Sequence, residues 1–263
     1  MAISAPDKVL GAGRLYFSLY DSDTQTFEPK RYMGNTPGFT ISIETETLEF
    51  VDSDNQVAVK EDEITTRLDR NASITCNNVS DENLALFLVA NVATLSQASG
   101  TATVETITAL SGRFYQLGVT AQNPTGVRNI SNVTVEDAGG GGTTYVEGTD
   151  YAVNATAGWV EILAGGGIAD AASLDVTYDN DQSDRTQITS DAVQPRSGEL
   201  HYLSDNTRGP NRDLYAPFVE MRPNGELPFK SRDTWMEMSF NTTFITRPGF
   251  APLYLDGRPV AGG

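Results

Sequence analysis

Carboxylates are the most abundant residues in this sequence that could do chemistry, and several of them are grouped. Two groups are the alternating pair Glu44 and Glu46 and the run Glu61-Asp62-Glu63. Such a pair can act as general acid and base when one carboxyl is removed from water and its pKa rises. Nothing in the surrounding sequence favours burial. Because 35 of the 263 residues are Asp or Glu, the grouping itself is weak evidence, and we expect no catalytic residue and no enzyme.

Metal and cofactor chemistry is also poorly supported. Counted from Asp52, a calcium-loop pattern would place its bidentate Glu at Glu63, but its turn glycine is replaced by Val57 and no helix flanks it. The single histidine, His201, and the single cysteine, Cys76, exclude His-rich or multi-cysteine metal sites and an internal disulfide framework. We therefore predict no metal and no cofactor.

The net charge of −17 argues against the usual binding of nucleic acid, because such a chain repels polyanions. The charge is uneven along the sequence: residues 1–97 carry 15 acids and 7 bases, residues 98–184 carry 11 and 2, and residues 185–263 carry 9 of each. We find no apolar run of transmembrane length, and the amino terminus lacks the pattern of a secretory signal. The uneven charge divides the sequence into three compositional blocks with these bounds.

The first block alternates between apolar and polar residues with a period of two, which is typical of half-buried strands. Two such runs predict a long hairpin with one apolar face and one wet face. The first run places Ile41, Ile43, Thr45 and Thr47 on one face and Ser42, Glu44 and Glu46 on the other; the second places Ile64, Leu68, Arg70, Ala72, Ile74 and Cys76 together, opposite Thr65, Arg67, Asp69, Asn71, Ser73 and Thr75.

A single helix is predicted over about residues 81–91, with Ser80 as its N-cap and acids in its first turn. The Thr-, Val- and Gly-rich middle block predicts short strands at 114–119, 133–136, 159–163 and 174–178, which is typical of a small β-sandwich. The last block predicts a strand over 235–245, followed by a proline-containing extended arm that could dock on its own domain or on a neighbour.

Several segments within residues 11–91 are informative by their order and spacing. They are Gly13-Arg-Leu-Tyr-Phe17, Arg31-Tyr-Met-Gly-Asn-Thr-Pro37 with the strand Phe39–Glu46, Thr65-Thr-Arg-Leu-Asp-Arg-Asn71 and Ser80-Asp-Glu-Asn-Leu-Ala-Leu-Phe87. Through these segments, the first and last blocks resemble tail tube proteins (major tail proteins) of long-tailed, non-contractile bacteriophages of the siphovirus type. The middle block resembles an Ig-like module common in phage tail proteins, through Tyr145–Tyr151, Gly158–Ile162 and Leu174–Tyr178.

The resemblance implies a mainly-β fold: a tube-type β-sandwich or barrel with one flanking helix, formed by residues 1–97 and 186–263. An inserted Ig-like β-domain, residues 98–185, is expected on the tube exterior. In relatives, hexameric rings of this structural virion protein stack into a tube with a β-barrel bore. The implied partners are other copies of the chain, a tape-measure protein, a tail terminator and a distal tail protein. Viral DNA is implied only as non-sticking cargo during ejection, and no membrane partner is implied. Self-assembly in the bacterial host cytoplasm, into the virion tail, is the expected location.

Acidic residues are the candidate site residues in this interpretation. A bore with the same sign of charge as phosphate would not hold passing DNA. The alternative is that these acids only keep the solvated face of an antiparallel sheet soluble, since any such sheet has one. The loop of about residues 48–62 and the carboxy-terminal arm are candidates for contacts between rings. The candidates for the lumen are Glu44, Glu46, Asp69 and Glu237; those for the inter-ring loop are Glu49, Asp52, Asp54, Glu61, Asp62 and Glu63.

Two alternative classes remain open at the level of sequence. One is the tube protein of a contractile tail or injection system, whose fold is related to that of the non-contractile tube. The other is a non-viral surface adhesion module that binds glycan or protein, against which the lack of a signal pattern weighs.

Overall fold

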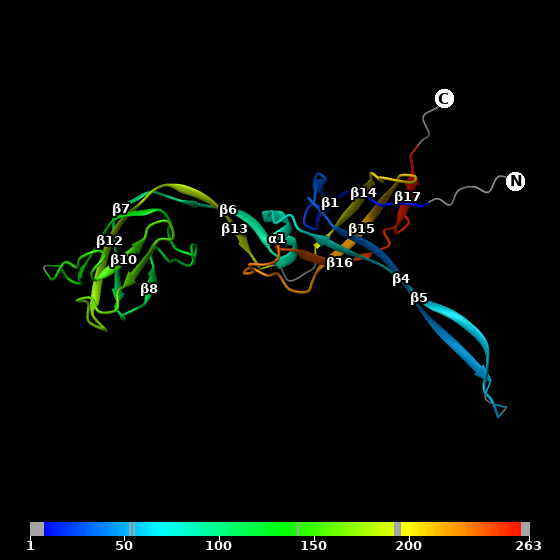
Figure 1. Ribbon diagram of the computed structural model, residues 1–263, viewed down its shortest axis with the longest axis horizontal. Coiled ribbons are helices and arrows are strands. Elements are labelled where there is room, and N and C mark those ends of the chain that lie inside the picture. The colour runs from blue at the N-terminus through cyan, green and yellow to red at the C-terminus, as the bar shows by residue number, and fades with distance from the viewer. Residues whose placement is uncertain (1–7, 53, 55, 141, 192–195, 259–263) are drawn as a thin grey trace. The chain divides into compact units, whose positions relative to one another are not determined.

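The computed structural model describes residues 8–258 except 53, 55, 141 and 192–195. The fold is mainly β, with antiparallel sheets and, in the described residues, one helix; 55% of the chain is strand and 3% helical. The chain divides into two compact units, which we call the sheet unit (Met1–Ala93 and Ile188–Gly263) and the inserted unit (Thr94–Gln187). Both are visible in Figure 1. These boundaries lie within four residues of those expected from the sequence.

The sheet unit is built on an antiparallel sheet to which the described residues contribute nine strands. Their order is β2-β1-β14-β15-β16-β5-β4, with β3 added beside β1 and β17 beside β15. The bounds are β1 Gly13–Asp21, β2 Thr26–Phe27, β3 Arg31–Tyr32, β4 Gly38–Asp52, β5 Val59–Cys76, β14 Arg196–Ser204, β15 Arg212–Asn224, β16 Met238–Phe244 and β17 Tyr254–Gly257.

One face of this sheet carries the core of the sheet unit. Alternating side chains such as Leu15 and Phe17 on β1, Leu200 on β14 and Phe240 on β16 are fully buried. The helix α1 (Asp81–Leu88) packs on them through Leu86 and Phe87, two buried members of the same hydrophobic cluster. The opposite face is the more polar one, as expected for an antiparallel sheet covered on one side.

The helix begins as the sequence predicts and ends earlier. Ser80 is the N-cap, and its side chain accepts a hydrogen bond from the backbone N–H of Asn83. Asp81 and Glu82 lie in the first turn, where the helix dipole favours negative charge. Val89 then adopts a left-handed conformation (φ 49°), which ends the helix at Leu88 instead of the expected residue 91. A β-branched residue in this region is rare, which explains why the pattern did not predict it.

The inserted unit is a β-sandwich of two three-stranded antiparallel sheets, ordered β10-β11-β8 and β7-β12-β9. Val160 and Ile162 from the first sheet and Leu174 and Val176 from the second belong to one fully buried cluster, so the two sheets share a core. The strands β7 and β10 were not expected from the sequence. The bounds are β7 Gly100–Thr108, β8 Phe114–Gln116, β9 Ile130–Asp137, β10 Tyr151–Asn154, β11 Trp159–Ile162 and β12 Ser173–Asn180.

The chain passes between the units through two strands, β6 (Asn91–Gln97) and β13 (Ser183–Thr189), which pair with each other. Two other expectations need correction. The region 48–62 is mostly strand, because β4 runs to Asp52 and β5 starts at Val59. The strand expected from residue 235 starts at Met238. Part of the expected arm forms β17, which pairs with β15 of its own unit, so this stretch takes one of the two docking options expected for the arm.

Asn83 is a buried polar residue that sequence reasoning missed, and it joins α1 to the sheet. Its Nδ2 donates to the carbonyl oxygens of Met33 (2.8 Å) and Asn78 (2.9 Å), and its Oδ1 accepts from Arg31 Nη1 (2.7 Å). The residue is fully buried. Removing its amide would leave two carbonyls and a guanidinium N–H without these partners, and unsatisfied buried groups are costly.

We therefore expect Asn83→Ala to lower the free energy of unfolding of the sheet unit by about 3 kcal/mol, measured by urea denaturation. Asn35→Ala is the matched control: it removes the exposed hydrogen bond from Asn35 Nδ2 to Asn77 Oδ1 (2.8 Å) and should cost about 0.5 kcal/mol or less. Equal losses for the two variants would contradict the role given to Asn83.

Candidate functional site

The hairpin formed by β4 and β5 extends beyond the sheet that carries it (Figure 1). β16 pairs with β5 only from Asn71 to Cys76, so among the described strands the stretch Val59–Arg70 has β4 as its partner and no other. β4 lies at the end of the strand order, so none of the other described strands pairs with its outer edge. We call the two-stranded part, residues 43–70, the ribbon.

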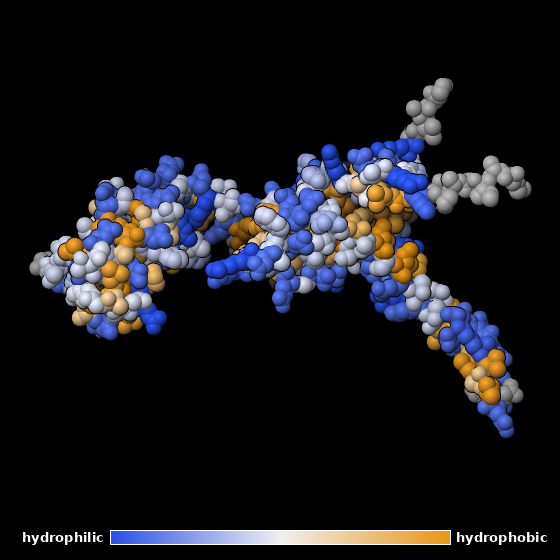
Figure 2. Space-filling model, in the orientation of Figure 1, coloured by the Kyte–Doolittle hydropathy of each residue, from blue (hydrophilic) through white to orange (hydrophobic). Residues whose placement is uncertain are grey.

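The ribbon exposes large apolar side chains (Figure 2). Leu48 and Ile64, which lie directly opposite each other, are 66% and 59% exposed. A two-stranded ribbon in water is marginally stable and has no partner against which to bury such residues. Exposed apolar groups of this extent mark an interaction surface. The exposed large apolar residues of the ribbon are Ile43, Leu48, Phe50, Val51, Val57, Val59, Ile64 and Leu68.

The apolar face changes sides along the ribbon, which corrects the expectation of one continuous face. The register shifts between Glu46 and Thr47, because Glu46 pairs with Arg67 while Thr47 pairs with Thr65. Ile64 therefore pairs with Leu48 and lies on the face opposite to that of Leu68, with which the period of two had grouped it. A β-bulge of this kind inserts one extra residue and re-aims the side chains that follow.

Near its far end the ribbon holds two acids against each other. Glu49 and Glu63 are directly opposite, a like-charge arrangement that is unfavourable in a sheet. Lys60 compensates, because its Nζ lies 2.8 Å from Glu49 Oε1 and 2.6 Å from Glu63 Oε2. The hydrogen bonds that Lys60 donates to Glu49 and Glu63 raise the pKa of Lys60, and Lys60 holds the pKa of Glu63 below its ordinary value.

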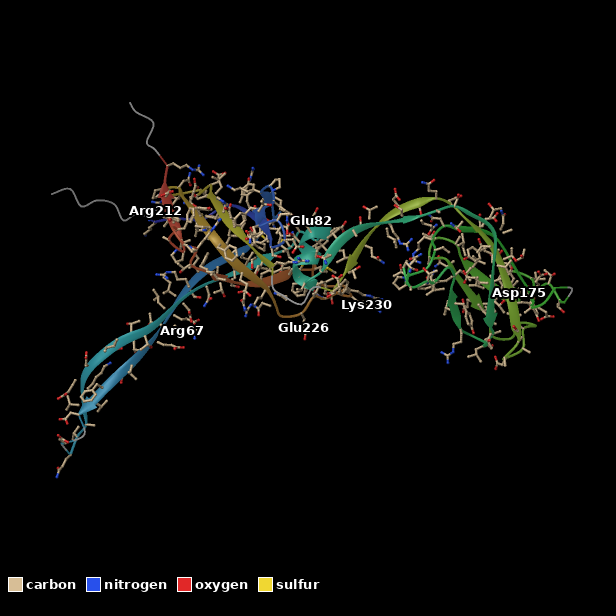
Figure 3. All side chains as sticks on the ribbon, turned by 180° about the vertical axis from the view of Figure 1, so that it is seen from behind. Arg67, Glu82, Asp175, Arg212, Glu226 and Lys230 are labelled. Atoms are coloured by element: carbon tan, nitrogen blue, oxygen red, sulfur yellow. The ribbon has the colours of Figure 1, made fainter. Side chains whose placement is uncertain are left out.

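The candidate lumen acids are brought together in part. Glu44 lies directly opposite Asp69, and Glu46 lies opposite Arg67. Arg67, labelled on the ribbon in Figure 3, bridges this group: its Nε is 2.8 Å from Asp69 Oδ2 and its Nη1 is 3.5 Å from Glu46 Oε1. Glu237 is exposed and precedes β16, so it is outside the paired strands and is not part of the group.

The six candidate loop acids lie mainly in strands instead of a loop. Glu49 and Asp52 are in β4, and Glu61, Asp62 and Glu63 are in β5. Asp54 lies between the strands, where its backbone N–H donates to Asp52 Oδ1 at 2.8 Å. Sequence reasoning did not name Lys60 as a site residue. Lys60 is the one basic residue in the segment 40–63, which contains eight acids, and this contrast could have identified it.

Two further observations bear on the class of protein. Among the described residues, no cluster of three or more His, Cys, Asp or Glu side chains has the arrangement needed to hold a metal ion. In the same part of the chain, no helix has the length and apolar character required to cross a membrane.

The fold and the ribbon define a mainly-β protein with an inserted β-sandwich and an exposed amphipathic hairpin. A family model described as "Protein of unknown function UCP028589" matches residues 8–241, which covers the inserted unit and most of the sheet unit. The chain belongs to this family. No curated protein matches it.

The charge pairing on the ribbon gives a pH-dependent test. In Lys60→Met, we expect the pKa of Glu63 to rise towards its ordinary value, because the ammonium group that stabilises its ionised form is gone. Carboxyl titration followed by NMR measures the change. Asp137, whose pKa is lowered by hydrogen bonds from the Thr143 N–H and the Tyr145 hydroxyl, should titrate as before. An unchanged Glu63 would show that Lys60 does not set its pKa.

Proposed function

We propose that this protein is the tail tube protein of a siphovirus-like phage or prophage, which assembles as stacked hexameric rings. The observation that carries the proposal is the ribbon. It exposes apolar side chains on a two-stranded hairpin, and among the described strands none pairs with the outer edge of the 15-residue strand β4. Such an edge is a template for pairing with another chain unless it is protected.

Ring closure would remove this edge. If the sheet of each copy pairs with that of the next copy, a closed ring leaves no free strand edges and buries the apolar residues of the ribbon. The resemblance of residues 11–91 to tube proteins supports this arrangement over a dimer. The alternative, the tube protein of a contractile tail, would associate in the same way. A sheath around the tube would distinguish it from the non-contractile tail tube.

The acids Glu44, Glu46 and Asp69 would line the bore in this assembly. They lie on the sheet face opposite to the core, and Arg67 neutralises them only in part. A negative wall repels phosphate over roughly 10 Å at physiological salt, which is effective in a narrow channel. DNA would therefore pass without adhering. The inserted unit would lie on the exterior, because a sandwich of that size would block the bore.

The first test is direct observation of assembly. We expect the purified full-length protein to form six-fold rings or long smooth tubes in negative-stain electron microscopy. A cryo-electron microscopy map should place the inserted unit outside and the three acids facing the lumen. Monomers under all conditions, or density of the inserted unit inside the bore, would refute the proposal.

The second test uses the ribbon. Deleting residues 50–60 should leave a folded monomer that makes no tubes, because the far end of the hairpin is lost while the core is untouched. Ile43→Lys should also prevent assembly, since it places a charge on an exposed apolar position, on the face opposite to the lumen acids, that becomes buried. Sedimentation and circular dichroism measure assembly and folding.

The matched control is Ser42→Lys, which adds the same charge one residue along and on the other face of the strand, the face assigned to the bore. This variant should retain assembly. Tubes of normal yield from Ile43→Lys or from the deletion would contradict the role of the ribbon, and so would loss of tubes from Ser42→Lys alone.

A further inference from the structure

The inserted unit displays two aromatic side chains on the solvent side of one of its sheets. In the sheet β10-β11-β8, Trp159 on β11 is 40% exposed and Phe114 on β8 is 62% exposed. Their ring centroids are 6.2 Å apart, with the ring planes inclined by 65°. The register places both on the same outer face, opposite to the buried Val160 and Ile162. We call this pair the aromatic platform.

The other sheet of the same sandwich shows that such a platform is not needed for folding. Its outer face, on the central strand β12, carries Asp175 and Thr177, which lie opposite Thr106 and Val104 of β7. Asp175, labelled in Figure 3, accepts a hydrogen bond from Thr106 Oγ1 at 2.7 Å. Hydroxyl and carboxylate groups, together with the exposed aliphatic Val104, thus suffice for a wet sheet face of this unit. The two exposed aromatic rings need another explanation.

Gln116 holds the indole of Trp159 in place. Its Oε1 accepts hydrogen bonds from Trp159 Nε1 and from Arg128 Nη1. Its Nε2 lies 3.1 Å from each of three backbone carbonyl oxygens, those of Leu117, Val127 and Gly158. A side chain anchored in this way loses little conformational entropy when a ligand binds, so the platform is preorganised.

Two clefts adjoin the platform, and both aromatic rings line each of them. The larger has a volume of about 530 Å³ and is bordered by Pro124 and Thr125. The smaller, of about 170 Å³, is bordered by Asn154 and Glu161. The surface therefore offers apolar ring faces between grooves that contain hydrogen-bonding groups, the combination found in sites for small organic ligands.

The charge of the inserted unit narrows the ligand class. Residues 94–187 contain 11 acids and three arginines, and Glu161 is the charged member of the outer face that carries the platform. An anionic ligand would be repelled. Arg128, which lines the larger cleft, donates Nη1 to the carbonyls of Thr125 (2.7 Å) and Ala157 (2.9 Å), so this N–H group is already used within the protein.

We infer that the aromatic platform binds a neutral oligosaccharide. The C–H groups on one face of a pyranose ring are weakly positive and match the negative face of an aromatic ring. The hydroxyl groups at its rim can donate to Glu161 and exchange hydrogen bonds with Asn154. Two sugar units contact Trp159 and Phe114, and the chain continues into the clefts. This activity is independent of tube assembly, since none of these residues belongs to the sheet unit.

The test uses the two tryptophans of the chain, because Trp235 of the sheet unit is 91% exposed and serves as the control. In full-length Trp235→Phe, where Trp159 is the reporter, fluorescence is titrated with maltohexaose, cellohexaose and chitohexaose. We expect at least one of them to shift or quench the emission in a saturable way, with a Kd of about 1 mM or tighter. A tri-galacturonate serves as the anionic probe.

Calorimetry then compares variants for the hexasaccharide that binds. Trp159→Ala and Phe114→Ala should each weaken binding at least about tenfold, while Trp235→Ala leaves it unchanged. Thermal unfolding establishes that each variant is folded; the more exposed Phe114 provides the test if Trp159→Ala is not. Failure of all three neutral sugars, tighter binding of the anionic probe, or equal loss from Trp235→Ala would overturn the inference. None of these outcomes depends on whether tubes form.

Discussion

The feature on which the rest of the structure depends is a sheet that continues beyond its own core. β5 has two strand neighbours near the core, and among the described strands it has β4 alone from Val59 to Arg70. Folding of a chain stabilises a strand when its apolar side chains leave water, and the ribbon lacks that contribution within one copy. The two strands pair along the ribbon apart from two register shifts, but its apolar side chains stay exposed and none of the described strands pairs with the outer edge of β4. Association with a second surface would bury these side chains and pair this edge. The ribbon, and not a cleft, is therefore the candidate functional site.

Electrostatics shape the ribbon within this constraint. Acids placed directly opposite each other, such as Glu49 and Glu63, would separate the strands, and one basic residue offsets the repulsion. Lys60 does so at the far end and Arg67 near the sheet. These exposed ion pairs contribute little to stability. Their effect is on geometry, because they link the two strands while the segment 40–63 keeps a net negative charge. In the proposed assembly, that charge would oppose association of the apolar positions before the rings form.

The sequence was informative where a period repeats and uninformative where one residue breaks it. Alternation at Ile41 and Ile43 predicted the hairpin, and Ser80 with its following acids predicted the start of the helix. The bulge opposite Glu46 was not predictable, because one inserted residue leaves both strands amphipathic in either register. Val89 ended the helix by a backbone conformation that its residue type disfavours. The sequence analysis identified the site acids from their abundance in these segments. Their ion pairs with Lys60 and Arg67 depend on the strand register, which only the structure provides.

The two hydrophobic cores allow the units to serve different purposes. Most of the described buried apolar residues of the sheet unit form one hydrophobic cluster, and those of the inserted unit, from Ala109 to Tyr178, form another. The chain leaves the sheet unit through β6 and returns to it through β13, and these two strands pair with each other. A substitution on the outer face of the sandwich therefore leaves the packing under α1 unchanged. In the proposed assembly, the surface that fits identical copies would be constrained at many positions at once, whereas the solvent-facing platform of Trp159 and Phe114 could change with the inferred ligand. Separate cores would let one chain satisfy both demands.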